Sequence, residues 1–177
     1  MFPAIPIDRF AARLGAQIFH QGSASLIQAI VSDSRQALWI QPTAFIALQT
    51  ESGDGHRYAQ HAAQQGAVAL ILQSDHCQPK FLEDLPETCT ILVVDDTWAA
   101  LHRLSAEHRQ ELAGPVIGIT GSNGKTTVKE YLFHLLGDAG IARSPKSFNS
   151  QLGVPLSLLA AAKDARATLL EVGVSAE

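Results

Sequence analysis

Charged residues and cysteines are scarce in this 177-residue chain, and each shortage excludes a class of protein. Charged residues make up 17% of the chain and hydrophobic residues 46%, so we expect a packed core rather than disorder. The net charge of −4 argues against a general nucleic-acid binder, which would carry a basic face. A chain of this length has room for one or two domains.

Long apolar runs are also missing. No stretch is long enough to cross a membrane, and the N-terminal residues 1–8 lack the basic start and apolar core of a signal peptide. The two cysteines, Cys77 and Cys89, have neither CxxC spacing nor nearby metal-ligand residues. We therefore expect a cytoplasmic protein with free thiols, no membrane insertion and no nucleic-acid partner.

Short apolar runs alternate with helical stretches along the chain. Strands are predicted at 26–31, 44–48, 67–72, 90–94, from 115, and at 167–172; helices are predicted at 8–14, 58–65, 98–112, 126–137 and 153–163. This alternation predicts an α/β fold with parallel sheet. The helix-breaking residues 113–115 predict a boundary between a domain at 1–113 and another at 114–177.

Several polar residues in or next to the predicted helices have an expected local role. Asp8 is the expected N-cap of the first helix. Asp95-Asp96 is either a carboxylate pair or, as its place before a helix favours, a cap provided by Asp96 or Thr97. Periodicity places His108 on the solvent face of its helix.

The segment Gly118–Thr127 carries the most informative pattern. It reads Gly-Ile-Thr-Gly-Ser-Asn-Gly-Lys-Thr-Thr between an apolar run and a helix. Glycines let several backbone N–H groups point at one anion, and a helix N-terminus adds partial positive charge. Lys125 would place its charge on the β- and γ-phosphates of a nucleotide, and Thr126 its hydroxyl on Mg²⁺. The pattern predicts a nucleoside triphosphate site.

One position departs from the general phosphate-loop pattern. That pattern has a glycine where this chain has Ile119, so the working glycines are Gly121 and Gly124. The alternative is an ordinary Gly/Asn turn with Lys125 in solvent. The order of strand, turn, Lys-Thr and helix favours the phosphate loop.

Three polar positions are candidates for other parts of a site. Glu171 ends an apolar strand, where open α/β sheets bind ligands, and is either a Mg²⁺ ligand or a solvated strand end. Arg35 in the segment Ser32–Arg35 either grips a phosphate or, as is more common, belongs to a polar turn. His56 either contacts a ligand or caps the following helix, and the spacing favours capping.

Taken in order, these segments resemble the Mur ligase family along nearly the whole chain. Thr120–Thr127 is similar to the family's ATP loop, which carries the same glycine offset. The other matching segments are Asp33–Arg35, Phe45–Leu48, Asp54–His56, Gly66-Ala67, Phe148–Leu156 and Glu171–Gly173. The best match is the member that joins D-alanyl-D-alanine to UDP-N-acetylmuramoyl-tripeptide, and Ser144–Gln151 looks like the form fused to an alanine racemase.

The resemblance implies an ATP-dependent amide ligase of peptidoglycan synthesis. Residues 1–113 would form the UDP-binding domain, and residues 114–177 the first part of a P-loop ATPase domain with parallel sheet. ATP would phosphorylate the tripeptide carboxylate, and the amine of D-Ala-D-Ala would attack the acyl phosphate. We expect the remaining ligase domains in the same polypeptide and no ligase activity from this chain alone.

The resemblance also implies which residues form the site. Lys125 is the implied catalytic residue, and ATP binding is implied for Gly121, Ser122, Asn123, Gly124, Lys125, Thr126 and Thr127. Substrate contacts are implied for Ser32, Ser34, Arg35, His56, Asn149 and Ser150. Mg²⁺ is implied to bind Thr126 and Glu171. Many members have two adjacent asparagines where this chain has Asn149-Ser150.

Two other functions are consistent with the residues. One is a non-catalytic module that binds a UDP-sugar or nucleotide. The other is a related Mur-type ligase with a different amino-acid or acyl substrate. The domain containing Asp33–Arg35 argues against a folate-type relative, because those relatives lack that domain.

Overall fold

The computed structural model describes residues 3–38, 42–51, 53–77, 85–145 and 148–173. The chain divides into two compact units, Pro3–Leu104 and Ser105–Glu177, described separately below. Each contains a largely parallel sheet with helices against it, which confirms the predicted α/β class. The division falls inside one helix, whereas the break at 113–115 suggested the boundary; the domains 1–113 and 114–177 stay a prediction. No helix in the described residues is long and apolar enough to span a membrane.

The first unit is built on a five-stranded sheet. Its elements are β1 (Ile5–Pro6), α1 (Ile7–Leu14), β2 (Gln17–His20), β3 (Leu26–Ile27), β4 (Ala29–Val31), η1 (Ser34–Leu38), β5 (Thr43–Ile46), β6 (Gln49–Thr50), β7 (Gly53–Asp54), η2 (Gly55–Tyr58), α2 (Ala59–Gln64), β8 (Ala69–Gln73), η3 (Ser74–His76), β9 (Thr90–Val94) and the start of α3 (Thr97–Glu111). The strand order is β2-β9-β8-β5-β4, in which β4, β5, β8 and β9 are parallel and β2 is antiparallel to β9. The pairs β1-β3 and β6-β7 are separate.

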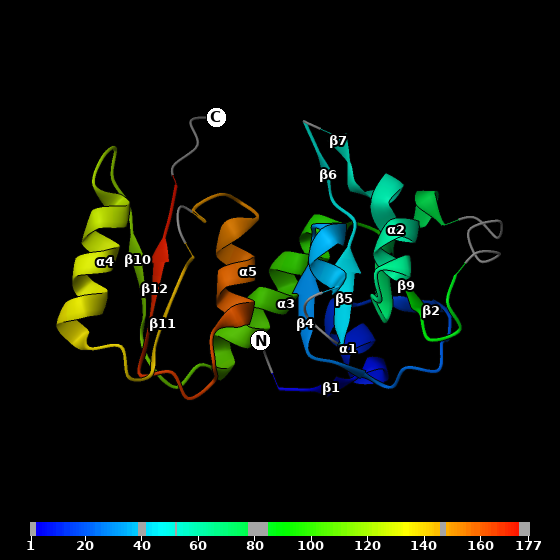
Figure 1. The fold of residues 1–177 in the computed structure, drawn as a ribbon, viewed down its shortest axis with the longest axis horizontal. Helices are drawn as coiled ribbons and strands as arrows, with labels where there is room; N and C mark the ends of the chain where they lie inside the picture. Colours follow the sequence, from blue (N-terminus) through cyan, green and yellow to red (C-terminus); the bar gives the residue numbers. More distant parts are fainter. Residues whose placement is uncertain (1–2, 39–41, 52, 78–84, 146–147, 174–177) are drawn as a thin grey trace. The chain divides into compact units, whose positions relative to one another are not determined.

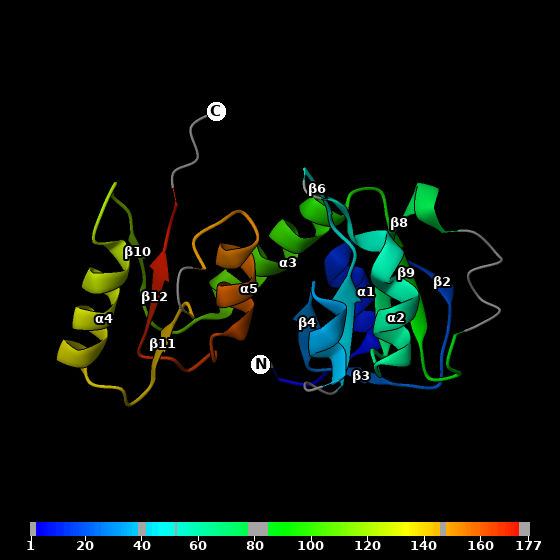
Figure 2. The same ribbon diagram turned by 45° about the horizontal axis from the view of Figure 1, so that its top comes forward.

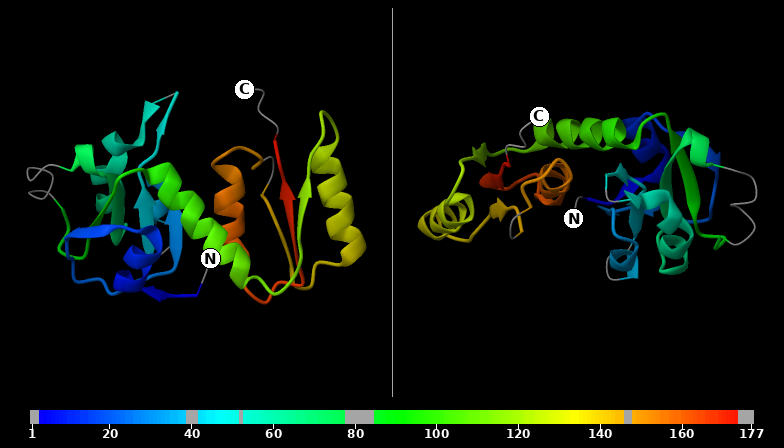
Figure 3. Two further views of the ribbon diagram at one scale, coloured as in Figure 1. Left: turned by 180° about the vertical axis from the view of Figure 1, so that it is seen from behind. Right: turned by 90° about the horizontal axis from the view of Figure 1, so that it is seen from above.

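The parallel strands of the first unit's sheet are buried on both faces, whereas the edge strand β2 is largely exposed. Phe45 and Leu70 belong to one apolar cluster with the alanines of α2, whereas the strand neighbours Ile46 and Ile71, which are also fully buried, point to the opposite face because side chains alternate along a strand. Viewed from above, α2 lies on one side of the sheet and α1 with the start of α3 on the other (Figure 3). Coverage on both sides explains why these strands are continuous apolar runs.

The second unit has a three-stranded parallel sheet. Its elements after α3 are β10 (Val116–Ile119), α4 (Lys125–Leu136), β11 (Ile141–Arg143), α5 (Gly153–Ala160) and β12 (Ala167–Glu171). The strand order is β10-β12-β11, so the last strand lies in the middle (Figure 1, Figure 2). Helices α4 and α5 cover opposite faces of this sheet (Figure 3). All three strands therefore end at one edge.

The helix caps confirm one prediction and correct another. Asp96 caps α3, because its Oδ1 accepts hydrogen bonds from the backbone N–H groups of Trp98 (2.8 Å) and Ala99 (3.1 Å). The predicted N-cap Asp8 is wrong, since Pro6 caps α1 and Asp8 lies inside the first turn. There its charge still favours the positive end of the helix dipole.

The predicted exposure of His108 is also wrong. The side chain is 1% exposed, and its Nε2 lies 2.9 Å from the carbonyl oxygen of Ala161. That oxygen accepts only, so Nε2 donates. The partner lies 53 residues away, and helical periodicity alone gives no sign of it.

Candidate functional site

Three loops leave the second unit's sheet at the same edge. Glu171 pairs in register with Ile119, the residue before the predicted phosphate loop, and Leu169 pairs with Arg143 on the other side. Because parallel strands carry their carboxyl ends to one edge, the phosphate loop, the segment after β11 and the end of β12 meet there. The topology thus places three segments distant in sequence around one point.

The phosphate loop has the backbone that its glycines allow. Gly121 and Gly124 have φ values of 147° and 76°, a region that residues with a Cβ rarely adopt. Helix α4 begins directly afterwards at Lys125, whose Nζ donates to the carbonyl oxygen of Gly121 at 2.6 Å. Ile119 is the last residue of β10 and is 8% exposed. An apolar side chain fits this strand position, which accounts for the missing glycine of the general pattern.

Glu171 is the centre of the contacts at this edge. Its side chain is buried, although a carboxylate usually lies in solvent. Thr126 Oγ1 donates to its Oε2 at 2.7 Å, and Asn149 Nδ2 donates to its Oε1 at 3.1 Å. The alternative of a solvated strand end is therefore wrong. The two predicted Mg²⁺ ligands lie in direct contact.

These two residues fit a magnesium ion by their chemistry. Mg²⁺ takes oxygen ligands, usually one or two carboxylates together with phosphate oxygens and water. Thr126 supplies a hydroxyl and Glu171 a carboxylate, and the turn that contains Gly121 and Gly124 is exposed. Their role as ligands stays a prediction.

The segment that carries Asn149 is fixed by close backbone packing. Gly173 N–H donates to the Asn149 carbonyl oxygen at 2.7 Å, and a Cβ on Gly173 would lie 2.8 Å from that oxygen. A larger residue at 173 would push the segment away from β12. Ser150 Oγ accepts from the Gly153 N–H at 3.1 Å, at the start of α5. A serine thus has a local role at this position, while its substrate contact stays a prediction.

In the first unit, the segment Ser32–Arg35 forms the polar turn that spacing favoured. Asp33 Oδ1 accepts from the backbone N–H of Arg35 at 3.0 Å, and its Oδ2 accepts from Arg35 Nη2 at 2.7 Å. The Arg35 guanidinium thereby holds the pKa of Asp33 below its usual value. Ser34 is buried with its Oγ 3.0 Å from His61 Nδ1, and Ser32 is half-buried. Arg35, 81% exposed, can still turn toward a ligand.

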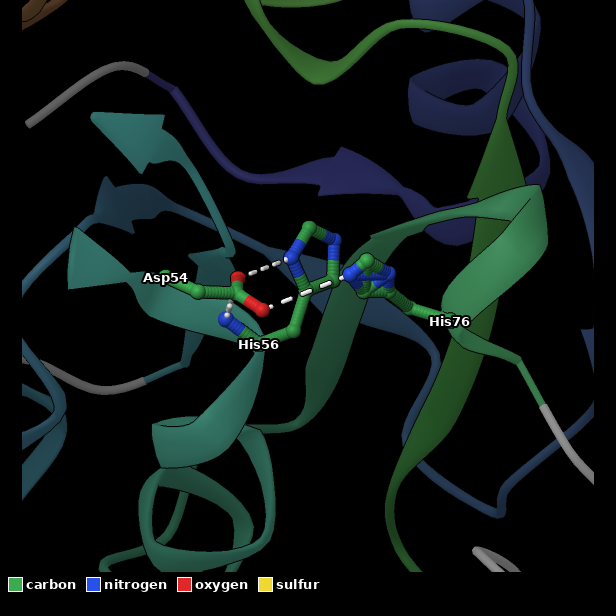
Figure 4. A group of neighbouring side chains, drawn as sticks. All are labelled: Asp54, His56 and His76. Atoms are coloured by element: carbon green, nitrogen blue, oxygen red, sulfur yellow. Dashed lines mark hydrogen bonds and ion pairs between the residues drawn. The ribbon is translucent and has the colours of Figure 1, made fainter. Parts of the chain in front are cut away.

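His56 lies in a hydrogen-bonded group with Asp54 and His76 (Figure 4). The favoured capping role of His56 is wrong, because Tyr58 is at the N-cap position of the following helix α2. Asp54 caps η2 by accepting from the backbone N–H of His56 at 2.9 Å. His56 is buried; its Nδ1 lies 2.7 Å from Asp54 Oδ1, and its Nε2 accepts from the backbone N–H of Gln73 at 3.1 Å. Both ring nitrogens are engaged, which favours a positioning role; the predicted UDP contact stays a prediction.

Asp54, His56 and His76 are residue types that bind metal ions, but their hydrogen bonds argue against a metal site here. One atom each from Asp54, His56 and His76 lie within 4.8 Å of one another. Because the Gln73 N–H donates to His56 Nε2, the ring proton is on Nδ1 and points at Asp54. His56 then has no lone pair for a metal ion. The group holds η2 against the end of β8.

The sequence comparisons find relatives along most of the chain. Residues 119–177 match the Mur ligase middle domain. A Bacillus subtilis UDP-N-acetylmuramoyl-tripeptide–D-alanyl-D-alanine ligase is 34% identical over 154 residues, which are 86% of this chain and 32% of the relative. The Escherichia coli K12 protein of the same name is 32% identical over 157 residues, 88% of this chain and 32% of its own length. The chain belongs to the Mur ligase family.

Solved Mur ligase structures share this fold. MurF from Acinetobacter baumannii is 28% identical with a TM-score of 0.79, and the match covers 97% of this chain and 36% of that protein. MurF from Thermotoga maritima in complex with ADP is 29% identical with a TM-score of 0.67, covering 84% of this chain and 33% of that protein. The chain spans about a third of the length of the relatives it matches.

One residue that lies against Glu171 was not predicted from the sequence. Lys129 is completely buried, and its Nζ lies 3.7 Å from Glu171 Oε2. A lysine on an amphipathic helix is normally taken as exposed. The available signal was its spacing, because residues three apart on a helix share a face and Lys129 follows Thr126 by three.

Proposed function

We propose that this chain is the part of a MurF-type ligase that holds the phosphates of ATP and the UDP end of the UDP-linked tripeptide substrate. The contact of Thr126 and Asn149 with the buried Glu171, beside Lys125, supports the nucleotide part. The names of the relatives support the substrates, UDP-N-acetylmuramoyl-tripeptide and D-Ala-D-Ala. The reaction is amide formation through an acyl phosphate.

The residues of the phosphate loop act mainly by charge and orientation. Phosphoryl transfer spreads negative charge over the γ-phosphate oxygens, so a fixed cation and aimed N–H groups lower the barrier. Lys125 is half-buried at the start of α4, and its ammonium exchanges the Gly121 carbonyl for phosphate oxygens. Thr126 and Glu171 would hold Mg²⁺, which would supply further positive charge at the phosphates. Asn149 orients Glu171 through its Oε1.

The first unit is proposed to bind the UDP portion. The turn Ser32–Arg35 follows β4 and η3 follows β8, so both lie at the carboxyl edge of the parallel strands. Ser34 is fixed by His61, and His56 by Asp54 and Gln73. Arg35 is exposed, and a diphosphate would replace Asp33 as the partner of its guanidinium. Ser32 and Ser150 are further proposed contacts to substrate.

The nucleotide part is tested by calorimetry of ADP binding to the 177-residue chain with and without Mg²⁺. We expect binding that Mg²⁺ strengthens and that Lys125→Met weakens by about tenfold or more, as for the loss of a charged phosphate contact. Lys163→Met is the matched control, because Lys163 is half-buried like Lys125 but pairs with Glu111 rather than with the loop. Equal ADP affinity in Lys125→Met and the control would contradict the proposed phosphate site.

A further inference from the structure

Helix α4 has an inverted distribution of side chains. Its apolar residues Val128, Tyr131 and Leu135 are exposed, whereas Lys129 is 0% exposed. A lysine is almost never fully buried unless its charge is paired, because removing an ammonium group from water is costly. The position therefore calls for a partner of opposite charge.

The contacts of Lys129 identify that partner. Its Nζ donates to the carbonyl oxygen of Ser144 at 2.9 Å and lies 3.7 Å from both Glu171 Oε2 and Glu130 Oε1. Glu130 also pairs with the guanidinium of Arg143 and is partly exposed. The buried carboxylate facing the buried ammonium is that of Glu171.

Ser144 joins the lysine and the glutamate through the backbone. Its Oγ accepts from the backbone N–H of Glu171 at 3.1 Å, and its own N–H donates to the carbonyl of Leu169 at 2.9 Å. Lys129 thus links α4 to the carboxyl ends of β11 and β12. The carboxylate that faces Thr126 is fixed by charge from one side and through the backbone from another.

We propose that Lys129 is a positioning residue whose ammonium is the built-in counter-ion of Glu171, and that it makes divalent-cation binding at Glu171 depend on phosphate. The counter-ion role stands on the contacts alone, while the dependence on phosphate rests on the proposed function. Before a nucleotide binds, Lys129 balances the buried carboxylate. It also repels a lone divalent cation approaching the same oxygen.

Coulomb's law explains why the ammonium of Lys129 and a divalent ion at Glu171 repel each other strongly. A divalent ion bound to Glu171 Oε2 comes within a few ångströms of an ammonium that cannot move into solvent. The repulsion energy between two positive charges at such distances is large where the effective dielectric constant is low. The negative charge of a bound triphosphate offsets this repulsion. Metal and nucleotide therefore enter together.

The first test is Mg²⁺ alone, without nucleotide. The wild-type chain is expected to keep its unfolding temperature when MgCl₂ is added to roughly 10 mM, compared with NaCl of equal ionic strength. Lys129→Met is expected to rise by about 2 °C or more under the same addition, because the carboxylate has lost its counter-ion and binds the metal. Lys163→Met should behave as the wild type. No Mg²⁺ response in Lys129→Met would overturn the proposal.

The second test separates charge pairing from packing. If Lys129 is the counter-ion of Glu171, the double variant Lys129→Met/Glu171→Gln unfolds at higher urea than Lys129→Met alone, because the unpaired buried carboxylate is gone. A double variant that is weaker than both single variants would show a packing role only and overturn the proposal. Should Lys129→Met not fold, Lys129→Gln removes the charge while keeping a donor toward Ser144, and the same two measurements apply.

These measurements use no nucleotide. Failure of the wild-type chain to bind ADP would count against the proposed function, and a missing coupling between Lys129 and Glu171 would count against this inference.

Discussion

At this site, the role of a single residue depends more on the side chains that it contacts than on its amino-acid type. Glu171 is a buried acceptor for Thr126 and Asn149, and Lys129 is a buried cation. Residue type predicted the chemistry of Lys125 and Thr126, because a phosphate loop is read over a few consecutive positions. It did not predict the role of Lys129, because that role depends on Glu171 at the end of β12.

Replacing Arg35 tests the proposed UDP side. Arg35→Ala is expected to lower affinity for UDP-N-acetylmuramoyl-tripeptide about tenfold or more while leaving stability nearly unchanged, because exposed ion pairs contribute little to folding. Calorimetry and urea unfolding measure the two effects. Arg9→Ala, an exposed arginine on α1, is the control. Unchanged affinity in Arg35→Ala would contradict this role.

The two cysteines are free, as predicted, and are expected to differ in reactivity. Burial raises the pKa of the Cys89 thiol to about 12, so only about one molecule in ten thousand carries its thiolate at pH 8. Burial raises the pKa of the partly exposed Cys77 as well. Iodoacetamide followed by peptide mass mapping should label Cys77 first and Cys89 only in urea. Equal labelling rates in the folded chain would disprove this.

At the level of elements, strands and helices were easier to predict than their ends. The helix predicted at 98–112 is α3, at Thr97–Glu111, and the strand at 90–94 is β9. Such elements follow from local periodicity. The cap of α1 and the burial of His108 were predicted wrongly, because they depend on Pro6 and on the distant Ala161.

The junction between η2 and β8 is expected to weaken in acid. Burial acts to raise the pKa of Asp54, but hydrogen bonds from the His56 backbone and ring outweigh it and lower the pKa. A carboxylate with a lowered folded pKa stabilises the fold above its unfolded pKa of about 3.9, and this contribution is lost as pH falls through the folded value.

Asp54→Asn tests this pH dependence. The urea midpoint of the wild type should fall more steeply below about pH 4 than that of Asp54→Asn, which has no carboxylate to protonate. Asp75→Asn is the control, because the Asp75 side chain is 65% exposed. Parallel pH curves for the wild type and Asp54→Asn would refute the assignment.

On the scale of the whole molecule, the part of the chain that the structure describes has two sheets with parallel strands, besides the short pairs β1-β3 and β6-β7. Each of the two has loops at the carboxyl ends of its parallel strands. The proposed function assigns a different ligand to each. Mg²⁺ with ADP should slow amide exchange in 116–126 and 168–173, and UDP-N-acetylmuramoyl-tripeptide should slow it in 29–35 and 54–58. Hydrogen-exchange mass spectrometry reads both at once. The assignment would be contradicted if each ligand protected the segments that are assigned to the other ligand.

The sequence by itself determined the features that a short stretch of chain encodes. The glycines at 121 and 124 permit a phosphate loop, the apolar runs form the buried strands, and the ordered motifs identify the family. Tertiary structure decided which polar residues meet. The parallel register sets Glu171 beside Ile119, and α4 then places Thr126 and Lys129 against that carboxylate. No local pattern predicts such contacts, because they arise only when residues 52 positions apart, such as Ile119 and Glu171, pair at one edge of a sheet and water is excluded from the charges there.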